Sequence, residues 1–170
     1  MNQSEKRRFL IQSLLKEKPE YRDLSIPTEP ESQRQLLRGL MNIRAPQRIG
    51  ADFLKTQDEY LQGETAAKGI TDVADLTPVQ SGLYLWQGDI TTLKCDAIVN
   101  AANSGMTGCY IPNHRCIDNA IHTYAGVELR LACEELMEQQ GYPEPTGQAK
   151  ITPAFNLPCR YVLHTVGPII

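Results

Sequence analysis

The hydrophobic pattern of this chain changes near Pro78, and that change constrains its fold more than any other feature. Before Pro78, apolar residues recur at helical spacing in three stretches that prolines interrupt. After it, short apolar runs with the length of strands surround a helical region at 118–140. These runs lie at 83–86, 97–99, 149–152 and 161–166. The sequence therefore predicts a helical N-terminal extension over 1–78 and an α/β domain with a mixed or parallel sheet over 79–170.

Charge changes at the same boundary. Residues 1–78 hold twelve basic and twelve acidic side chains, whereas 79–170 hold five and eight. The net charge of −3 gives no general attraction to nucleic acid or anionic lipid. No apolar run approaches the roughly 20 residues of a membrane-spanning helix, and the first residues lack the pattern of a secretory signal. We therefore expect a cytoplasmic protein without nucleic-acid or membrane partners.

Cysteine usage gives the first chemical signal. The chain has five cysteines, an odd number, which argues against a disulfide framework. Cys109, His114 and Cys116 form the pattern Cys-x4-His-x-Cys, and thiolates with imidazole are the ligands that select zinc over magnesium or calcium. Three ligands leave one position of a tetrahedral ion open. This is not a standard zinc-finger spacing, so the residues alone also allow two packed thiols beside a solvated histidine.

Four segments, taken in order, resemble the macrodomain family, whose members bind ADP-ribose and related metabolites. The segments are 86–91 (WQGDIT), 96–104 (DAIVNAANS), 117–126 (IDNAIHTYAG) and 161–168 (YVLHTVGP). Between Asn103 and Asp118, where most macrodomains carry a run of glycines around the diphosphate, this chain has the Cys/His segment instead. That departure is similar to the zinc-containing microbial branch of the family, which resembles protein ADP-ribosyl hydrolases and carries a helical N-terminal extension.

The resemblance implies a fold and a metal. The expected fold is α/β: a macrodomain-like three-layer structure with a mixed sheet flanked by helices. The C-terminal part of that domain, with its second phosphate loop, is expected to lie beyond Ile170, so this chain alone should be poorly soluble because a sheet edge and an apolar face would be open. Cys109, His114 and Cys116 are implied to ligate Zn²⁺.

The resemblance also implies roles for five residues. Asp89 would accept a hydrogen bond from the adenine amino group, with the Ile90 backbone alongside, and Asn103 would hold the distal ribose hydroxyls, with Asn100 as a further ligand-binding residue. Asn103 and Asp118 are the expected catalytic residues, because an amide orients hydroxyls without titrating and a carboxylate near the metal can take a proton. A plainer interpretation stays open for Asp89, Asn100, Asn103 and Asp118, as residues that cap a helix, a strand or a turn.

The expected function is a zinc-dependent hydrolase that removes mono-ADP-ribose from protein side chains, preferably from a carboxylate ester. By resemblance its partner would be ADP-ribose or a mono-ADP-ribosylated protein, with a lipoyl-carrier protein as a candidate. Two alternatives stay open: an ADP-ribose-binding module with a structural zinc, and a zinc knuckle for protein contacts. His122, one turn after Asp118, is expected to pack inside the protein with its ring hydrogen-bonded rather than to serve as a fourth ligand.

Overall fold

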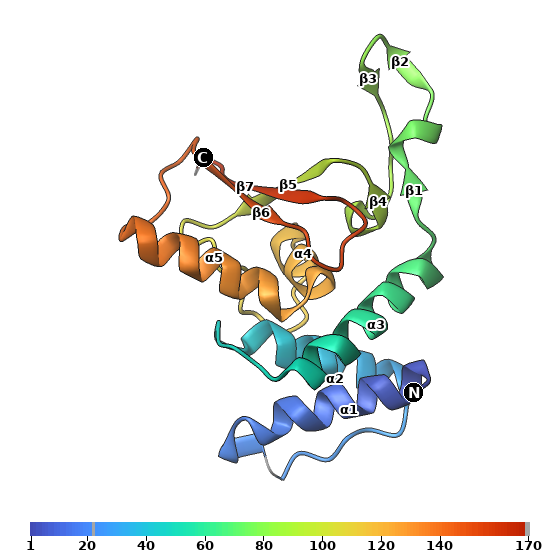
Figure 1. Ribbon diagram of the computed structural model, residues 1–170, viewed down its shortest axis with the longest axis vertical. Helices are drawn as coiled ribbons and strands as arrows, with labels where there is room; N and C mark the ends of the chain where they lie inside the picture. The colour runs from blue at the N-terminus through green and yellow to red at the C-terminus, as the bar shows by residue number, and fades with distance from the viewer. Residues whose placement is uncertain (22, 169–170) are drawn as a thin grey trace.

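The computed structural model describes residues 1–21 and 23–168, and Figure 1 shows helices gathered on one side of a small sheet. The N-terminal helices are α1 (Gln3–Lys16), α2 (Pro30–Ile43) and α3 (Ala51–Lys68). Asn2 and Glu5 form a capping box at the start of α1, and Pro30 stands in the first turn of α2, where its missing N–H costs no hydrogen bond. The three predicted helical stretches are confirmed.

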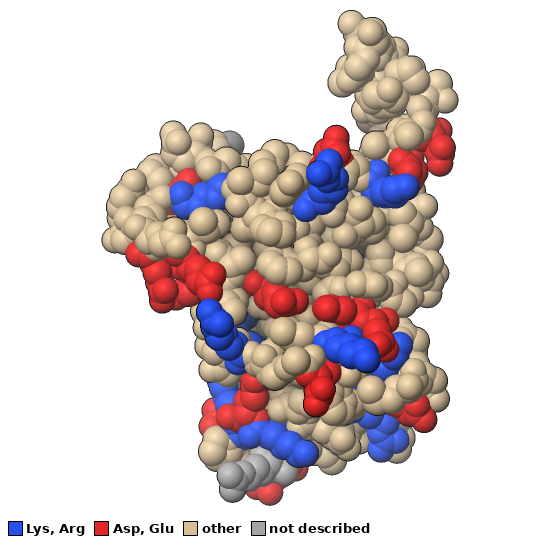
Figure 2. All heavy atoms as spheres, viewed as in Figure 1, with Lys and Arg blue, Asp and Glu red and all other residues tan. Residues whose placement is uncertain are grey.

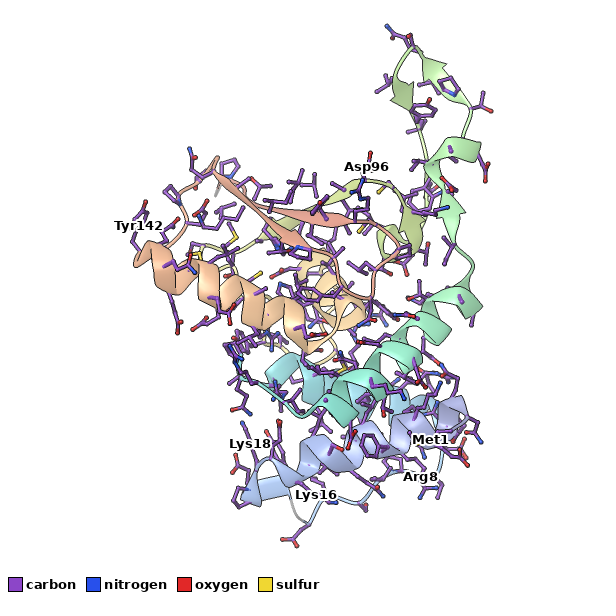
Figure 3. The ribbon with its side chains drawn as sticks, viewed as in Figure 1. Met1, Arg8, Lys16, Lys18, Asp96 and Tyr142 are labelled. Carbon is purple, nitrogen blue, oxygen red and sulfur yellow. The ribbon has the colours of Figure 1, made fainter. Side chains whose placement is uncertain are left out.

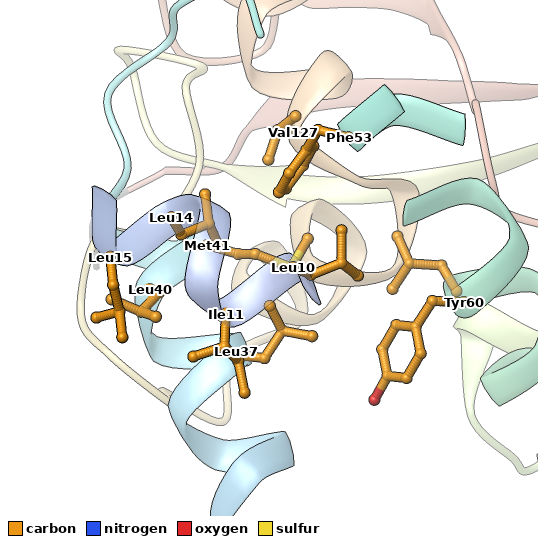
Figure 4. Close-up of a cluster of buried hydrophobic side chains, with 11 residues drawn as sticks. Leu10, Ile11, Leu14, Leu15, Leu37, Leu40, Met41, Phe53, Tyr60 and Val127 are labelled. Atoms are coloured by element: carbon orange, nitrogen blue, oxygen red, sulfur yellow. The ribbon is translucent and has the colours of Figure 1, made fainter. Parts of the chain in front are cut away.

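These helices share a hydrophobic core (Figure 4). Its buried members are Leu10, Ile11, Leu14, Leu15, Leu37, Leu40, Met41, Phe53, Tyr60, Leu61 and Val127. Burial of one such leucine stabilises the fold by about 2 kcal/mol. Val127 comes from a later helix, α5 (Val127–Gln140), so the N-terminal helices pack onto the rest of the molecule through this core.

The main sheet has three strands, in the order β5, β7, β6. They are β5 (Ala97–Ala102), β6 (Ala149–Pro153) and β7 (Tyr161–Val166). β5 runs parallel to β7, and β6 runs antiparallel to it, which confirms the predicted mixed sheet. Inward side chains such as Ile98 and Val162 pack against α4 (Ile117–Ala125) and α5 in a second core. In the same register Asn100 lies opposite His164, with both side chains fully buried.

Two predicted elements are wrong in extent. Gly126 divides the single helix predicted over 118–140 into α4 and α5, because its backbone angles, φ 99° and ψ 174°, are accessible almost only to glycine. The strand predicted at 83–86 shrinks to β3 (Leu83–Tyr84). It pairs with β2 (Pro78–Gln80) in a hairpin that projects from the body of the molecule, where Leu85 is 82% exposed. The apolar run at 83–86 predicted a strand but could not indicate whether another part of the chain would cover its side chains.

The remaining elements are short. They are the parallel pair β1 (Thr71–Asp72) and β4 (Leu93–Lys94), and the 3₁₀ segments Pro19–Tyr21, Val73–Asp75 and Ile90–Thr92. Figure 2 shows charges of both signs interspersed over the helical part of the molecule and none on the tip of the hairpin. Within the described residues, no helix has the length and apolar character that crossing a membrane requires.

Candidate functional site

Three of the predicted site residues meet at the carboxyl end of β5. Figure 3 labels Asp96, the residue before β5. Asn100 lies in the second half of this strand and Asn103 directly follows it. The Asn100 amide donates to Asp118 Oδ1 at 2.8 Å, and the Asn103 amide lies 3.5 Å from Asp118 Oδ2. The same Asn103 amide donates to the Gly108 carbonyl at 3.1 Å. One carboxylate is thus held between two amides, one of them inside the fold and one at its surface.

Burial controls the behaviour of Asp118. Its side chain lies in the first turn of α4 and is almost completely buried. Burial raises the pKa of Asp118, and the hydrogen bond from Asn100 and the charge of Arg130 oppose that rise without cancelling it. The positive end of the α4 dipole also favours the carboxylate at this position. A carboxyl group with a raised pKa and donors on both oxygens suits a proton-transfer role.

The loop of residues 104–116, here called the Cys/His loop, brings together the three predicted metal ligands. The donor atoms of Cys109, His114 and Cys116 all lie within 4.8 Å of one another, and Cys109 Sγ is 3.6 Å from His114 Nδ1. Cys116 is also the N-cap of α4, where its sulfur accepts the Asn119 backbone N–H at 3.4 Å. Burial, with the neighbouring Cys109 and Asp118, raises the pKa of the Cys116 thiol. A bound cation would offset the cost of ionising the two thiols, and neutral imidazole is a further donor, so the residues fit a metal ion.

A second group of potential ligands lies inside the fold. His122, Cys133 and His164 bring their donor atoms within 4.8 Å of one another, and all three are buried. Burial raises the pKa of the Cys133 thiol to about 12 and lowers the pKa of His122 well below its usual value, with Arg130 adding to the latter effect. A buried guanidinium that disfavours a proton on His122 also disfavours a metal cation. We therefore interpret this group as a polar core beside Asp118. His122 is buried and stands apart from the Cys/His loop ligands, as predicted, but the expectation that its ring is hydrogen-bonded is wrong, because neither ring nitrogen has a hydrogen-bond partner among the described residues.

Asp89 is held in a different place. It caps the 3₁₀ segment Ile90–Thr92, with Oδ1 accepting from the Thr91 backbone N–H at 2.9 Å. Its other oxygen accepts from Lys68, at the end of α3, at 2.9 Å, and the same ammonium lies 3.3 Å from the centre of the Tyr124 ring. Burial alone would raise the pKa of Asp89, but the hydrogen bonds from Thr91 and Lys68 hold it below its usual value.

Asp89 lies beside a different part of α4 from the group formed by Asn100, Asn103 and Asp118. Tyr124, which contacts Lys68, lies six residues after Asp118, about 9 Å along a helix. Asp89 is therefore linked, through Lys68, to the end of α4 that lies away from Asp118. Ile90 is half-buried beside the second core. A single ligand that contacts both Asp89 and the group around Asp118 must therefore be elongated.

Sequence reasoning missed four residues around the Cys/His loop, Arg38, Asn42, Asn119 and Arg130, and it also missed Lys68 beside Asp89. Arg130 is buried on α5 and donates to the Thr107 carbonyl at 2.7 Å and to the Asn42 carbonyl at 2.7 Å. Its position three residues after Val127 on the inward face of a helix was the available signal, because an arginine there must find buried acceptors. Arg38 and Lys68 gave no such signal, since cations on helices are usually solvated.

Comparisons with known proteins agree on one family. Residues 99–170 match the Macro domain family. A relative from Treponema medium named protein-ADP-ribose hydrolase is 60% identical over 100% of this chain and 67% of its own length. A protein of the same name from Staphylococcus aureus (strain MRSA252) is 47% identical over 95% of this chain and 61% of its own length. The Trypanosoma brucei macrodomain in complex with ADP-ribose is 26% identical with a TM-score of 0.50, over 84% of this chain and 61% of that one.

Proposed function

Because this chain belongs to the Macro domain family, we propose that it carries the N-terminal part of a hydrolase that removes mono-ADP-ribose from modified protein side chains. The observation that carries the proposal is the meeting of Asn103, Asp118 and the Cys/His loop at one end of β5. The relatives from T. medium and S. aureus, both named protein-ADP-ribose hydrolase, support it. This chain spans about two thirds of the length of those relatives, so the proposal concerns the full-length protein.

We propose Zn²⁺ as the metal of the Cys/His loop, because two thiolates and one imidazole are the donor set that zinc prefers. Cys109, His114 and Cys116 would hold it. When bound with an open coordination position, zinc supplies Lewis acidity that polarises an oxygen of the substrate or lowers the pKa of a bound water.

The protein's own groups then have separate tasks. The Asn103 amide orients the distal ribose hydroxyls once it exchanges the Gly108 carbonyl for them. Asp118 accepts the proton of the attacking water, the water oxygen bonds to the anomeric carbon, and the carboxylate of the modified side chain leaves with the electrons of the broken C–O bond. Asn100 is fully buried, so its side chain acts by fixing Asp118 Oδ1 rather than by touching the ligand.

Adenine recognition is assigned to Asp89 and the Ile90 backbone. An exocyclic amino group can donate to Asp89 Oδ2 once Lys68 moves aside, while Oδ1 stays fixed by Thr91. The carboxylate is kept ionised by its lowered pKa, so it is an acceptor at neutral pH. We also propose that the protein acts in the cytoplasm; its five cysteines are all free thiols, which suits a reducing compartment.

The experiment is release of ADP-ribose from a mono-ADP-ribosylated carrier, with a modified lipoyl-carrier protein and a modified acidic peptide as two substrates. Full-length protein should release ADP-ribose, and Asp118→Asn, Cys116→Ala or chelation should each lower the rate at least a hundredfold. Cys95→Ala is the matched control, because Cys95 is a half-buried thiol outside the Cys/His loop. Tight ADP-ribose binding without release at any zinc concentration would instead identify a binding module with a structural metal.

A further inference from the structure

The Cys/His loop is held from outside by the N-terminal helices. Inside the loop, backbone hydrogen bonds close tight turns at Met106 and His114, and Asn113 has φ of 56°, a left-handed conformation that costs a non-glycine residue about 1 kcal/mol. A loop in this conformation needs partners elsewhere to stay in one arrangement. Those partners lie on α2.

Arg38 of α2 contacts the loop directly at His114 and indirectly through Asn119 of α4. Its guanidinium donates to the His114 carbonyl at 3.0 Å and to Asn119 Oδ1 at 2.8 Å. Asn119 is fully buried and connects Arg38 to the loop, because its side-chain amide donates to the Ile111 carbonyl at 3.0 Å. Both of these partners are neutral, so the role of Arg38 here is directional hydrogen bonding rather than ion pairing.

Asn42, one turn further along α2, binds Asn113, which lies between Ile111 and His114 in the loop. Its Oδ1 accepts the Asn113 backbone N–H at 2.9 Å, and its amide donates to Thr123 of α4 at 3.0 Å. The side chain is only 1% exposed, so these bonds are shielded from water. Asn42 therefore fixes the peptide next to His114 and ties it to the helix that Cys116 caps.

Gly39 lets α2 come close enough to do this. A Cβ at this position would lie 3.3 Å from the side-chain Nδ2 of Asn113 and 3.7 Å from Pro112 Cβ. Glycine inside a helix costs about 1 kcal/mol relative to alanine, so its presence here is explained by the close approach of the loop. Two faces of α2 therefore make different contacts. One packs into the helical core through Leu37, Leu40 and Met41. The other contacts the Cys/His loop through residues 38, 39 and 42.

We propose that Arg38 and Asn42 are positioning residues of the metal centre, so that the N-terminal extension sets the metal affinity of the Cys/His loop. This inference rests on the proposed metal centre. The extension would preorganise His114 and Cys116, and without it the loop would have to be ordered by the metal itself, which lowers affinity. Outer contacts of this kind are typically worth ten- to a hundredfold in metal affinity.

The test is zinc affinity of the full-length protein, measured by competition with a chromophoric chelator. Arg38→Ala should bind zinc at least tenfold more weakly than wild type, and Arg38→Lys should recover part of the loss, because an ammonium can reach the His114 carbonyl but cannot bridge to Asn119. Arg34→Ala is the matched control: it lies one turn earlier on α2, and its guanidinium pairs with Glu31 and Glu64 inside the extension. It should keep wild-type affinity.

A second variant and a second readout separate positioning from loss of fold. Asn42→Ala should also weaken zinc binding, and apo Arg38→Ala should show faster amide hydrogen exchange across 108–116 while exchange in α1 and β7 stays at the wild-type rate. If Arg38→Ala and Asn42→Ala both bind zinc as tightly as wild type, the positioning role is refuted and the metal centre stands. If wild type itself binds no zinc, the metal centre fails and the positioning role fails with it.

Discussion

His164 should make the stability of this protein depend on pH. Its ring lies fully buried on β7, with Nδ1 3.1 Å from the Asn100 amide and Nε2 3.0 Å from Thr152 Oγ1. If the Asn100 amide donates to Nδ1 as it does to Asp118, the proton of the neutral ring sits on Nε2 and faces Thr152. Burial lowers the pKa of His164 from 6.5 to about 4, because a charged imidazolium would lose its hydration in this position.

The sign follows from where each state binds the proton. Above pH 6.5 the ring is neutral in both the folded and the unfolded chain, and the stability contribution is fully present. As pH falls from 6.5 toward 4, His164 becomes protonated in the unfolded chain but stays neutral in the folded chain, so the free energy of unfolding decreases. The full shift corresponds to about 3 kcal/mol, and the part lost between pH 7 and pH 5 is about 2 kcal/mol.

Urea unfolding of wild type and His164→Gln at pH 7 and pH 5 measures this directly. Glutamine keeps polar atoms near Asn100 and Thr152 but does not titrate, so the pH-dependent loss should be about 2 kcal/mol smaller in the variant than in wild type. Acid loss of any bound metal would occur in both proteins and cancel in the difference. Burial and the charge of Arg130 lower the pKa of His122 and His164 adds to this effect, so in the variant His122 titrates closer to its ordinary range and adds to the difference in the same direction. Equal losses in the two proteins would show that His164 is protonated in the folded state or accessible to water, which would refute the reasoning.

Three further predictions concern single contacts. Gly126→Ala should lower the free energy of unfolding by roughly 2 kcal/mol or more, because φ is 99° and the new Cβ would contact Gln57 closely. Gly141→Ala, where φ is 76° and the space is open, should lower it by about 1 kcal/mol, and urea titration compares the two. Arg130→Met should cost at least about 3 kcal/mol by the same measurement, because several buried carbonyls lose their donor. Lys68→Met should raise the pKa of Asp89, followed by carboxyl NMR, while changing stability by less than about 1 kcal/mol.

Local patterns predicted the elements well where the pattern itself determines the structure. The stripe that contains Leu10 and Leu14 buries one face of α1, as helical spacing requires. The run from Ala97 to Val99 forms part of β5, in which Ile98 is buried and Val99 is exposed. The run at 83–86 misled, because an apolar segment of that length favours a strand without specifying which part of the protein would cover it, and here Leu85 is exposed. Gly126 misled for the opposite reason: a single glycine inside a helical pattern is ambiguous until its backbone angles are known.

The candidate site divides in the same way. Cys109, His114 and Cys116 were recognisable because their side-chain chemistry is rare and their spacing is short, and the structure gathers their donor atoms. The burial of Asn100 was not foreseeable, since a polar residue after an apolar run normally marks the end of a strand, whereas β5 continues to Ala102. Arg38 and Asn42 act across more than seventy residues of sequence, and no local pattern encodes a contact at that separation.

The contacts of α2 also bear on why a Cys/His loop can stand where most macrodomains have a run of glycines. A glycine run follows a ligand because its backbone is free, and that freedom has an entropic cost when the ligand orders it. The Cys/His loop carries side chains that restrict its backbone and contains a left-handed Asn113, so it needs fixed partners rather than freedom. Arg38, Asn42 and Arg130 supply those partners, two of them from the extension. On this reasoning the extension and the Cys/His loop form one functional unit, and transplanting the loop alone into a macrodomain without α2 would produce a weak metal site.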